Sequence, residues 1–408
     1  MLKTELLEII ANGESSGVDF KRDDIRPEQL AKEVVAMANL RGGMVLLGVE
    51  DDRTISGLQR GDVEEWVMNC FANKIHPMIL PFYEEIQVDD KRVAIISFEQ
   101  GTSKPYVLRD KGREDVYIRV GTTSRLASRE QQARLYESGG MLHAEVLPVA
   151  GTSLSTLSME RLQDYLTKIL NDPDVPSDEA SWIERLIGLG YMTNGVSGDA
   201  VCTIAGTLVF GISPRRYLRQ AGVRLVVFDG VNKEYQALLD EVLDSPMVAL
   251  WRIDNGVRAL AENDYGLIER LVEKITPFVS NEAADIDENF RRERQWHYPR
   301  EAIREAVINA LVHRDWTRSV DIEIDIYSDR LEIISPGAMQ NSMTIDKMLA
   351  GQRSPRNSLI VEVLRDYGYV DARGMGVRTK IVPLMRNHSG KEPFFEATDD
   401  YLKTVLYR

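Results

Sequence analysis

Three acidic residues near the start of the chain are spaced so that they could act together on one ligand. Glu14 precedes a Ser-Ser-Gly turn, Asp19 lies inside a short strand-like segment, and Asp51 follows a second apolar segment. Carboxylates at strand ends can converge at one rim of a sheet, where two or three of them bind Mg²⁺ or Mn²⁺ through oxygen. Such an ion can activate water, and Lys21 could neutralise a phosphate beside it. The pattern therefore indicates a candidate metal site, with solvated surface acids as the alternative.

A second polar pattern lies on the helix that we expect to begin at Pro299. Glu301, Glu305, Asn309 and His313 recur every four residues, so they line one helix face next to an apolar face that would pack. Glu305 could orient a water molecule, and the amide oxygen of Asn309 could bind Mg²⁺, which together suit phosphate hydrolysis. The alternative interpretation is the polar flank of an ordinary helix.

The segment 104–125 is locally basic in a chain whose net charge is −14, since it holds six Lys and Arg residues against three Asp and Glu residues. Arg119 and Arg125 flank a Gly-Thr-Thr-Ser turn, where backbone N–H groups and the Thr122 hydroxyl could hold a phosphate. Together with Lys104, these residues are the candidate nucleic-acid contacts. The alternative is a solvated β-hairpin whose basic residues protect a strand edge.

An α+β fold of three blocks must position these residues. The first block covers 1–140, a mostly helical middle block covers 150–290, and the last block covers 291–408. The Ser- and Thr-rich segment 152–158 suggests a linker, and the acidic run 281–289 suggests a solvated boundary.

The periodicity of apolar residues predicts the main elements within each block. In the first block these are an initial helix, a helix that begins at Pro27, and strands at 18–21, 44–49, 93–98 and 116–120. In the middle block the strand candidates are 203–212 and 223–228. In the last block they are the helix that ends at His313, a hairpin of strands 321–327 and 331–334, and a helix at 357–366.

The composition excludes several classes of protein. The chain has 408 residues, of which 43% are hydrophobic and 28% charged, enough for several cores without disulfides. Its 64 acidic residues against 50 basic ones exclude a generally basic surface for nucleic acid or membrane. Two distant cysteines exclude a disulfide scaffold and indicate a reducing compartment. Without a signal-peptide pattern or an apolar run of spanning length, we expect a cytoplasmic protein with no membrane contact.

The motifs of common nucleotide and hydrolase sites are absent from the sequence. It contains no GxxxxGK[ST] phosphate loop, no HExxH or CxxC metal pattern, and no GxSxG nucleophile turn. The five histidines show no helical ligand spacing, so neither a hydrolase triad nor a His-rich zinc site is expected.

The first block resembles the Schlafen-type AlbA_2 domain over about 130 residues. Residues 14–21 (ESSGVDFK) are similar to its ES-x-x-VEFK motif, and residues 36–43 (AMANLRGG) to its AFAN-x-x-GG segment. The pieces GVED at 48–51, KPY at 104–106 and YIRVGT at 117–122 follow in the same order. The resemblance implies contact with nucleic acid. Some Schlafen proteins are metal-dependent endoribonucleases with three acids, which would here be Glu14, Asp19 and Asp51, although Asp19 stands where the pattern has Glu.

The last block resembles a degenerate GHKL-type ATPase module, the RecG-like C-terminal segment. Residues 305–316 are similar to the N-box helix of GHKL ATPases, and the pieces DRLEIISPG at 329–337, SPRN at 354–357 and GMG at 374–376 follow in order. The run at 203–214 resembles a segment that joins the two modules in bacterial proteins. The resemblance implies ATP contacts, with Glu305 as catalytic residue and Mg²⁺ on Asn309. The implied nucleotide-binding residues are Asn309, His313, Gly337, Arg356, Gly374 and Gly376.

One departure from the GHKL pattern concerns the base of the nucleotide. Working GHKL enzymes hold the adenine amino group with the Asp of D-x-G-x-G, whereas this chain has Ser335-Pro336-Gly337 in that region. We therefore expect nucleotide binding more readily than efficient turnover. No helicase motor accompanies the RecG-like segment.

Three functions remain open from the sequence. The first is a nucleic-acid-binding regulator, for RNA or DNA, whose GHKL-like module senses ATP. The second is a divalent-metal-dependent endonuclease that uses Glu14, Asp19 and Asp51 and is gated by nucleotide. The third is an ATPase whose first block is an interaction module. We also expect a homo-oligomer, because a closed assembly could present basic strips inward on an acidic protein.

Overall fold

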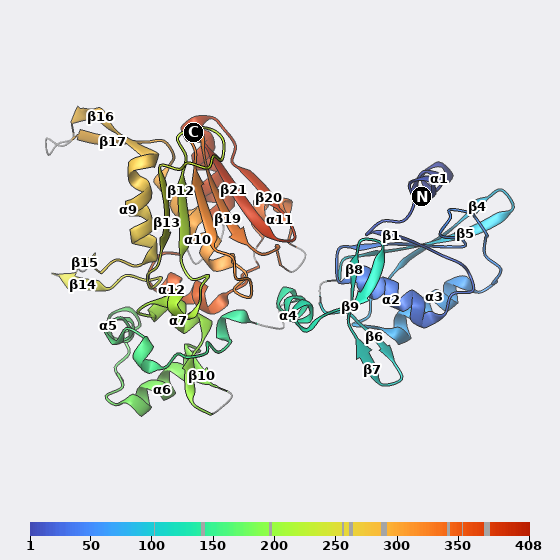
Figure 1. Ribbon diagram of the computed structural model, residues 1–408, viewed down its shortest axis with the longest axis horizontal. Coiled ribbons are helices and arrows are strands. Elements are labelled where there is room, and N and C mark those ends of the chain that lie inside the picture. The colour runs from blue at the N-terminus through green and yellow to red at the C-terminus, as the bar shows by residue number, and fades with distance from the viewer. Residues whose placement is uncertain are drawn as a thin grey trace. The chain divides into compact units, whose positions relative to one another are not determined.

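The computed structural model describes residues 1–101, 103–139, 143–195, 198–254, 257–260, 264–286, 292–340, 343–352, 354–370 and 376–408. The chain folds into two compact units, Met1–Leu142 and His143–Arg408 (Figure 1). Each unit combines helices with mainly antiparallel sheets, which confirms the α+β class.

The helices of the N-terminal unit are α1 (Lys3–Asn12), α2 (Pro27–Ala38), α3 (Val63–Lys74) and α4 (Arg129–Ser138). Its strands are β1 (Val18–Lys21), β2 (Gly42–Leu47), β3 (Ile75–His76), β4 (Phe82–Val88), β5 (Lys91–Glu99), β6 (Val107–Asp110), β7 (Arg113–Asp115), β8 (Tyr117–Val120) and β9 (Thr123–Leu126). The main sheet has the order β1-β2-β5-β4, with β1 and β2 parallel and the other pairs antiparallel. Every element predicted for this block is confirmed, with small shifts of its bounds.

The two faces of this sheet carry separate apolar clusters. Leu6 and Ile10 of α1 pack with Phe20 of β1 on one face, while α2 and α3 supply the larger cluster on the other. Because side chains alternate along a strand, Asp19 faces away from the α1 side. The short strand β1 therefore places an acidic side chain in the interior of the unit.

The motif at residues 36–43 has a structural explanation. Asn39, at the end of α2, donates its amide N–H groups to the carbonyls of Tyr106 and Tyr117 and accepts a hydrogen bond from the Tyr106 N–H. A Cβ on Gly42 would lie 2.5 Å from the backbone of Glu99, and the φ of Gly42 is +78°. The motif therefore fixes how α2 leads into β2, and its polar atoms serve the fold.

The helices of the C-terminal unit are α5 (Met159–Asp164), α6 (Glu179–Gly188), α7 (Ile204–Phe210), α8 (Pro214–Tyr217), α9 (Leu267–Val279), α10 (Arg300–His313), α11 (Ile345–Leu349), α12 (Ser358–Asp366) and α13 (Val382–Ser389). Shorter helical turns are η1 (Ala144–Val146), η2 (Leu154–Thr156), η3 (Tyr165–Ile169) and η4 (Val377–Ile381). Its strands are β10 (Met192–Asn194), β11 (Ala200–Cys202), β12 (Val223–Val227), β13 (Leu239–Leu243), β14 (Trp251–Asp254), β15 (Val257–Leu260), β16 (Ser280–Ile286), β17 (Arg292–Trp296), β18 (Ile322–Ile326), β19 (Arg330–Pro336), β20 (Phe394–Ala397) and β21 (Tyr401–Tyr407).

A six-stranded sheet with the order β13-β12-β18-β19-β21-β20 organises this unit. The predicted hairpin of β18 and β19 is confirmed, and so is the predicted helix α10. Strand β12 pairs in parallel with β18, so two strands from the middle of the chain extend the sheet of the last block. The boundary predicted near residue 290 is therefore wrong, because both blocks share one sheet and one compact unit.

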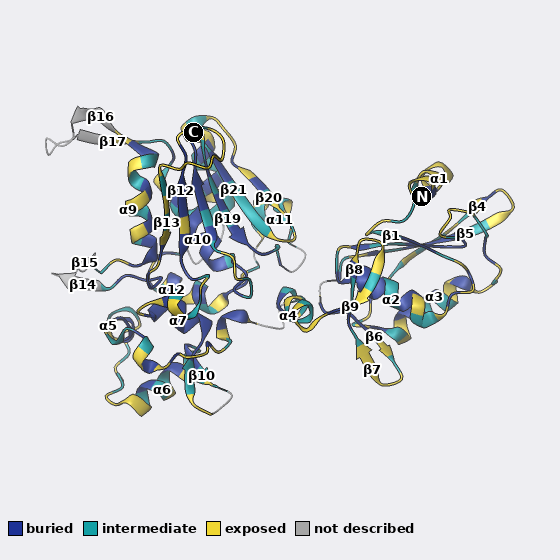
Figure 2. Ribbon diagram, in the orientation of Figure 1, coloured by how far each residue is buried: buried dark blue, intermediate teal, exposed yellow. Residues whose placement is uncertain are grey.

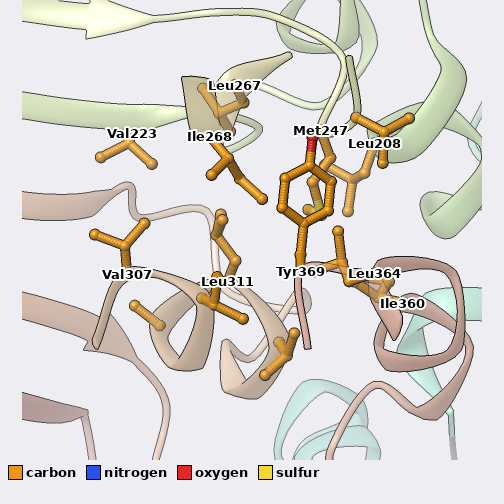
Figure 3. Packing of buried hydrophobic residues seen from close by; sticks show 14 of the residues in the cluster. Leu208, Val223, Met247, Leu267, Ile268, Val307, Leu311, Ile360, Leu364 and Tyr369 are labelled. Carbon is orange, nitrogen blue, oxygen red and sulfur yellow. The ribbon is translucent and has the colours of Figure 1, made fainter. Parts of the chain in front are cut away.

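The packing behind the sheet explains why these blocks cannot be separated. The cluster in Figure 3 joins Val307 and Leu311 of α10 to Leu208 of α7 and Ile360 of α12. Figure 2 shows β12 and α10 largely in the colour of buried residues. One apolar core thus holds the helix that carries the predicted polar stripe.

Two local predictions in the middle block are wrong. Residues 204–210 form α7, because Thr203 caps a helix by accepting a hydrogen bond from the Gly206 N–H, and all seven helical residues are buried. A run that is apolar on every side carries no periodicity to separate helix from strand. The linker predicted at 152–158 is also packed: Leu154 and Leu157 lie in the core, and the Thr152 hydroxyl bonds to backbone groups.

The acidic run predicted as a boundary at 281–289 belongs partly to a hairpin. Residues up to Ile286 lie in β16, which pairs with β17. The rest of the run lies outside the described residues. The described part of the chain contains no helix long and apolar enough to cross a bilayer.

Candidate functional site

A cavity of about 310 Å³ in the C-terminal unit brings together most of the predicted nucleotide contacts. Its walls come from α10, the segment after β19, the residues before and within α12, the start of η4, and strands β20 and β21. The predicted residues that line it are Glu305, Asn309, His313, Gly337, Arg356 and Gly376. Gly374 lies outside the described residues.

Glu305 and Asn309 are neighbours on the cavity wall. The Asn309 amide nitrogen donates to Glu305 Oε1 at 3.4 Å, which leaves the amide oxygen for another partner. Lys380 Nζ lies 3.9 Å from Glu305 Oε2, and the Glu305 side chain is 13% exposed. The carboxylate is thus held between a helix neighbour and a cation. Lys380, four residues after Gly376, belongs to no motif, so the sequence did not identify it as a residue of the site.

Two glycines at the cavity lie close to charged side chains. A Cβ on Gly376 would lie 1.7 Å from Glu305 Oε1, so any larger residue there would displace that carboxylate. Gly337 has a φ of +117°, and a Cβ there would lie 2.1 Å from Arg356 Nη1. Arg356 is buried and donates to the Ala338 carbonyl at 2.6 Å. The glycine motifs therefore set the distances between the charged groups of the cavity.

His313 ends α10 on the same cavity wall. Burial, assisted by the nearby positive charge of Arg356, lowers the pKa of His313 to about 4. The imidazole is consequently neutral near pH 7. Its ring can then donate one hydrogen bond and accept another.

Further lining residues carry no motif of their own. Most are apolar, among them Met339, Met343, Met348, Phe395 and Leu402. Ser335, in the segment 335–337 that stands in the region of the GHKL Asp, donates its hydroxyl to the Ala310 carbonyl at 2.9 Å. The spacing of polar residues on α10 predicted only the polar wall of the cavity. The apolar wall could not be predicted, because it is assembled from segments that are far apart in the chain.

In the N-terminal unit, the predicted acids meet basic residues. Asp19 is 1% exposed; its Oδ1 lies 2.8 Å from Arg119 Nη2 and its Oδ2 lies 2.5 Å from Lys21 Nζ. Glu14 Oε1 accepts a hydrogen bond from the Phe20 N–H and lies 3.9 Å from Lys21 Nζ. Burial raises the pKa of Glu14, with smaller contributions from the charges of Asp19 and Asp51. The structure thus joins Glu14, Asp19 and Lys21, while Asp51 is exposed.

These acids form no metal site in the part of the chain that the structure describes, where no group of three or more His, Cys, Asp or Glu side chains could hold an ion. The physical reason is charge pairing. Arg119 also contacts Glu33 of α2, at 2.5 Å, so charges alternate from Glu33 through Arg119, Asp19 and Lys21 to Glu14. Opposite charges in a buried place compensate each other's loss of hydration.

Two predicted nucleic-acid contacts are wrong because their side chains are buried and bound within the unit. The Arg119 side chain is fully buried in its ion pairs. Lys104 is 7% exposed and donates its ammonium group to the Leu40 carbonyl at 3.0 Å. Neither can reach a polyanion. Thr122 and Arg125, in contrast, are exposed on the β8–β9 hairpin, and Lys111 and Arg113 are exposed around the β6–β7 turn.

Comparisons with known proteins bear on both units. Residues 14–128 match the family model "Schlafen, AlbA_2", and residues 320–406 match the family model "Putative ATP-dependent DNA helicase recG C-terminal". The chain carries a Schlafen AlbA_2 domain and a RecG-like C-terminal domain. Both resemblances drawn from the sequence are thereby confirmed, and they relate the protein to nucleic acid and to ATP.

Two solved structures are similar to the chain. The DIP2311 protein from Corynebacterium diphtheriae is 23% identical with a TM-score of 0.43, over 99% of this chain and 79% of that one. The N-terminal domain of a "Putative ATP-dependent DNA Helicase RecG-related Protein" from Nitrosomonas europaea is 24% identical with a TM-score of 0.25, over 31% of this chain and 91% of that one. No curated protein matches the chain.

Proposed function

We propose that this chain is a nucleic-acid-binding regulatory protein whose RecG-like unit binds a nucleoside triphosphate. One observation carries the proposal: Glu305, Asn309, His313, Gly337, Arg356 and Gly376, from four separate segments, line one cavity. Its volume of about 310 Å³ is at the lower end of small-molecule sites. The apolar part of its wall suits the flat ring of a nucleotide base, and its few polar groups suit the sugar and the phosphates.

The end of the cavity near Glu305 suits the phosphates. The Asn309 amide oxygen is a hard oxygen donor of the kind that Mg²⁺ prefers, and Mg²⁺ bound with a nucleotide would neutralise phosphate charge there. Glu305, held by Asn309 and near Lys380, is placed to orient a water molecule. Arg356 adds positive charge to the cavity wall. These groups support binding and a slow hydrolysis.

A buried acid links the cavity wall to the segment that follows the AlbA_2 domain. Glu145 is 1% exposed and accepts hydrogen bonds from the N–H groups of Leu359 and Ile360, both at 3.0 Å, and from the Ser358 hydroxyl. It thereby caps α12, which begins two residues after Arg356. Nucleotide bound against Arg356 would bias the position of α12 and, through Glu145, the chain that leads to the N-terminal unit.

The exposed basic residues of the N-terminal unit support nucleic-acid contact. Arg125, Lys111 and Arg113 are exposed on two hairpins, and Thr122 lies in the turn next to Arg125. Such a small basic surface would hold phosphates of RNA or DNA with a modest dependence on salt. A nuclease would need ion ligands that the paired acids do not offer.

Nucleotide binding is tested by calorimetry with ATP and Mg²⁺ on the full chain, together with phosphate release. Glu305→Gln should leave the Kd for ATP within about threefold and lower phosphate release roughly 10²-fold, as expected for loss of a general base. The control is Glu301→Gln, an exposed acid one turn earlier on α10, which should match the wild type. Failure of ATP to bind the wild-type protein would refute the proposal.

Regulation is tested by fluorescence anisotropy with labelled tRNA, single-stranded DNA and duplex DNA at several salt concentrations, with and without ATP. We expect nucleotide to change the affinity for one of these probes, and Glu145→Gln to abolish the change while ATP still binds. Cutting of a probe with Mn²⁺ that Asp51→Ala abolishes would favour the endonuclease instead. An affinity that never responds to nucleotide would remove the regulatory role.

A further inference from the structure

His313 has a position in the cavity that differs from those of Glu305 and Asn309. The three residues lie on one face of α10 at steps of four residues, so the imidazole stands about 12 Å along the helix axis from Glu305. Both lie on the wall of the same cavity. A nucleotide whose phosphates lie near Glu305 and Asn309 would extend along α10 and place its base near His313.

The ring of His313 has unused hydrogen-bonding capacity. Among the described residues, none forms a hydrogen bond or ion pair with it, although Arg356 lies close enough to act on its charge. The nearby Ser335 hydroxyl is already engaged with the Ala310 carbonyl. The cavity therefore offers an imidazole, neutral near pH 7, at the end away from Glu305.

We propose that His313 recognises the base of the nucleotide and that the cavity accepts adenine and guanine alike. The inference rests on the proposed nucleotide binding and adds the residue and the class of base. A neutral imidazole presents either an N–H donor or a bare nitrogen acceptor, depending on its tautomer. It can accept from the amino group of adenine or donate to the carbonyl group of guanine. Facing the same position of the base, a carboxylate, which only accepts, would favour the amino group of adenine over the carbonyl group of guanine.

The experiment is calorimetry with ATP, GTP and inorganic triphosphate on the full chain. The wild type should bind ATP and GTP with Kd values within about threefold of each other. His313→Leu should weaken both nucleotides roughly 3- to 10-fold, the effect of one net hydrogen bond, and leave inorganic triphosphate unchanged. His313→Gln, which keeps a donor and an acceptor, should restore both affinities. His313→Asp should retain ATP and weaken GTP.

The outcomes separate this inference from the proposed function. If ATP and GTP bind the wild type and bind His313→Leu equally well, base recognition by His313 is overturned while nucleotide binding stands. A wild-type preference for ATP over GTP of roughly 100-fold, beyond what one hydrogen bond supplies, would overturn the shared recognition of both bases. If neither nucleotide binds the wild type, the proposed function fails, and the inference fails with it. Glu301→Gln, exposed on the same helix, controls for a general effect of substitution in α10.

Discussion

The polar groups of the N-terminal unit neutralise one another, whereas those of the C-terminal cavity face a space that can hold a ligand. Asp19 is sealed between Arg119 and Lys21, and it is 1% exposed. Glu305 and Asn309 line a cavity of about 310 Å³, and their mutual hydrogen bond is long at 3.4 Å. The acids of the first group lie within the matched AlbA_2 residues 14–128, whereas Glu305 and Asn309 precede the matched RecG-like residues 320–406. Only the second group is placed to meet a small molecule.

This difference shows that a motif can mark a structural network as readily as a site. In the AlbA_2 domain, the short strand β1 carries Asp19 into the interior, where an isolated charge would be costly, so Arg119 is buried with it. On α10, Glu305, Asn309 and His313 follow one another at steps of four residues and line the cavity, which the segments after α10 do not fill. The two groups differ because a cavity lies beside the polar atoms of α10, whereas the polar atoms of Asp19 are enclosed by basic side chains.

The largest expected effect is on the ion network of the N-terminal unit. Asp19→Asn leaves Arg119 buried with Glu33 as its remaining acidic partner, and should destabilise the unit by about 3 kcal/mol. Hydrogen exchange of peptides from β1 and β2 in the full chain measures the change. Asp24→Asn, an exposed acid paired with Arg22, should change it by less than about 0.5 kcal/mol. An Asp19 variant that stays stable but loses a metal-dependent activity would show that Asp19 belongs to a functional site and not to a structural ion network.

The next effect is the pH dependence of the C-terminal unit. The folded-state pKa of His313 is about 4, below the ordinary value of 6.5, so the unfolded chain binds more protons between these values. Stability is therefore present above pH 6.5 and falls as pH decreases, by about 2 kcal/mol from pH 7 to pH 5 for this group. Denaturant unfolding of the wild type and of His313→Gln at both pH values isolates the contribution. An equal loss in both proteins would mean that His313 does not titrate as the cavity requires.

A smaller cost is expected from Gly376→Ala, because the added Cβ would meet Glu305 Oε1 at 1.7 Å and force the carboxylate aside. Overpacking should cost about 1–2 kcal/mol, and phosphate release should fall roughly tenfold because the displaced carboxylate orients water less well. Gly188→Ala is the matched control, since that helical glycine has open space around its Cβ position. Unchanged phosphate release in Gly376→Ala would show that the position of the Glu305 carboxylate does not matter for hydrolysis.

The smallest effect on stability is expected at the exposed hairpin. Arg125→Ala should change stability by less than about 0.5 kcal/mol, yet weaken nucleic-acid binding and reduce its salt slope by about 1. Arg109→Ala is the control, because Arg109 already pairs with Glu114 at 2.6 Å. Anisotropy titrations at several salt concentrations measure both. Equal slopes for the wild type and Arg125→Ala would remove the hairpin from the interface.

Local patterns predicted much of the fold and part of the site. The stripe on α10 was predictable because helical periodicity places residues four apart on one face, and the hairpin of β18 and β19 followed from alternation. Residues 204–210 were predicted as a strand and form a helix, because an all-apolar run has no period. The buried role of Lys104 was equally invisible, since its acceptor at Leu40 lies 64 residues away.

The amino-acid sequence by itself determined most of the elements, the two domain families and the set of polar side chains on α10, because propensity and periodicity act over a few residues. Only the tertiary structure decided which charges meet. Arg119 pairs with Asp19 across 100 positions, and β12 joins β18 across the middle of the chain. These contacts depend on how apolar faces pack, so burial turned one predicted site into an ion network and left the other open as a cavity.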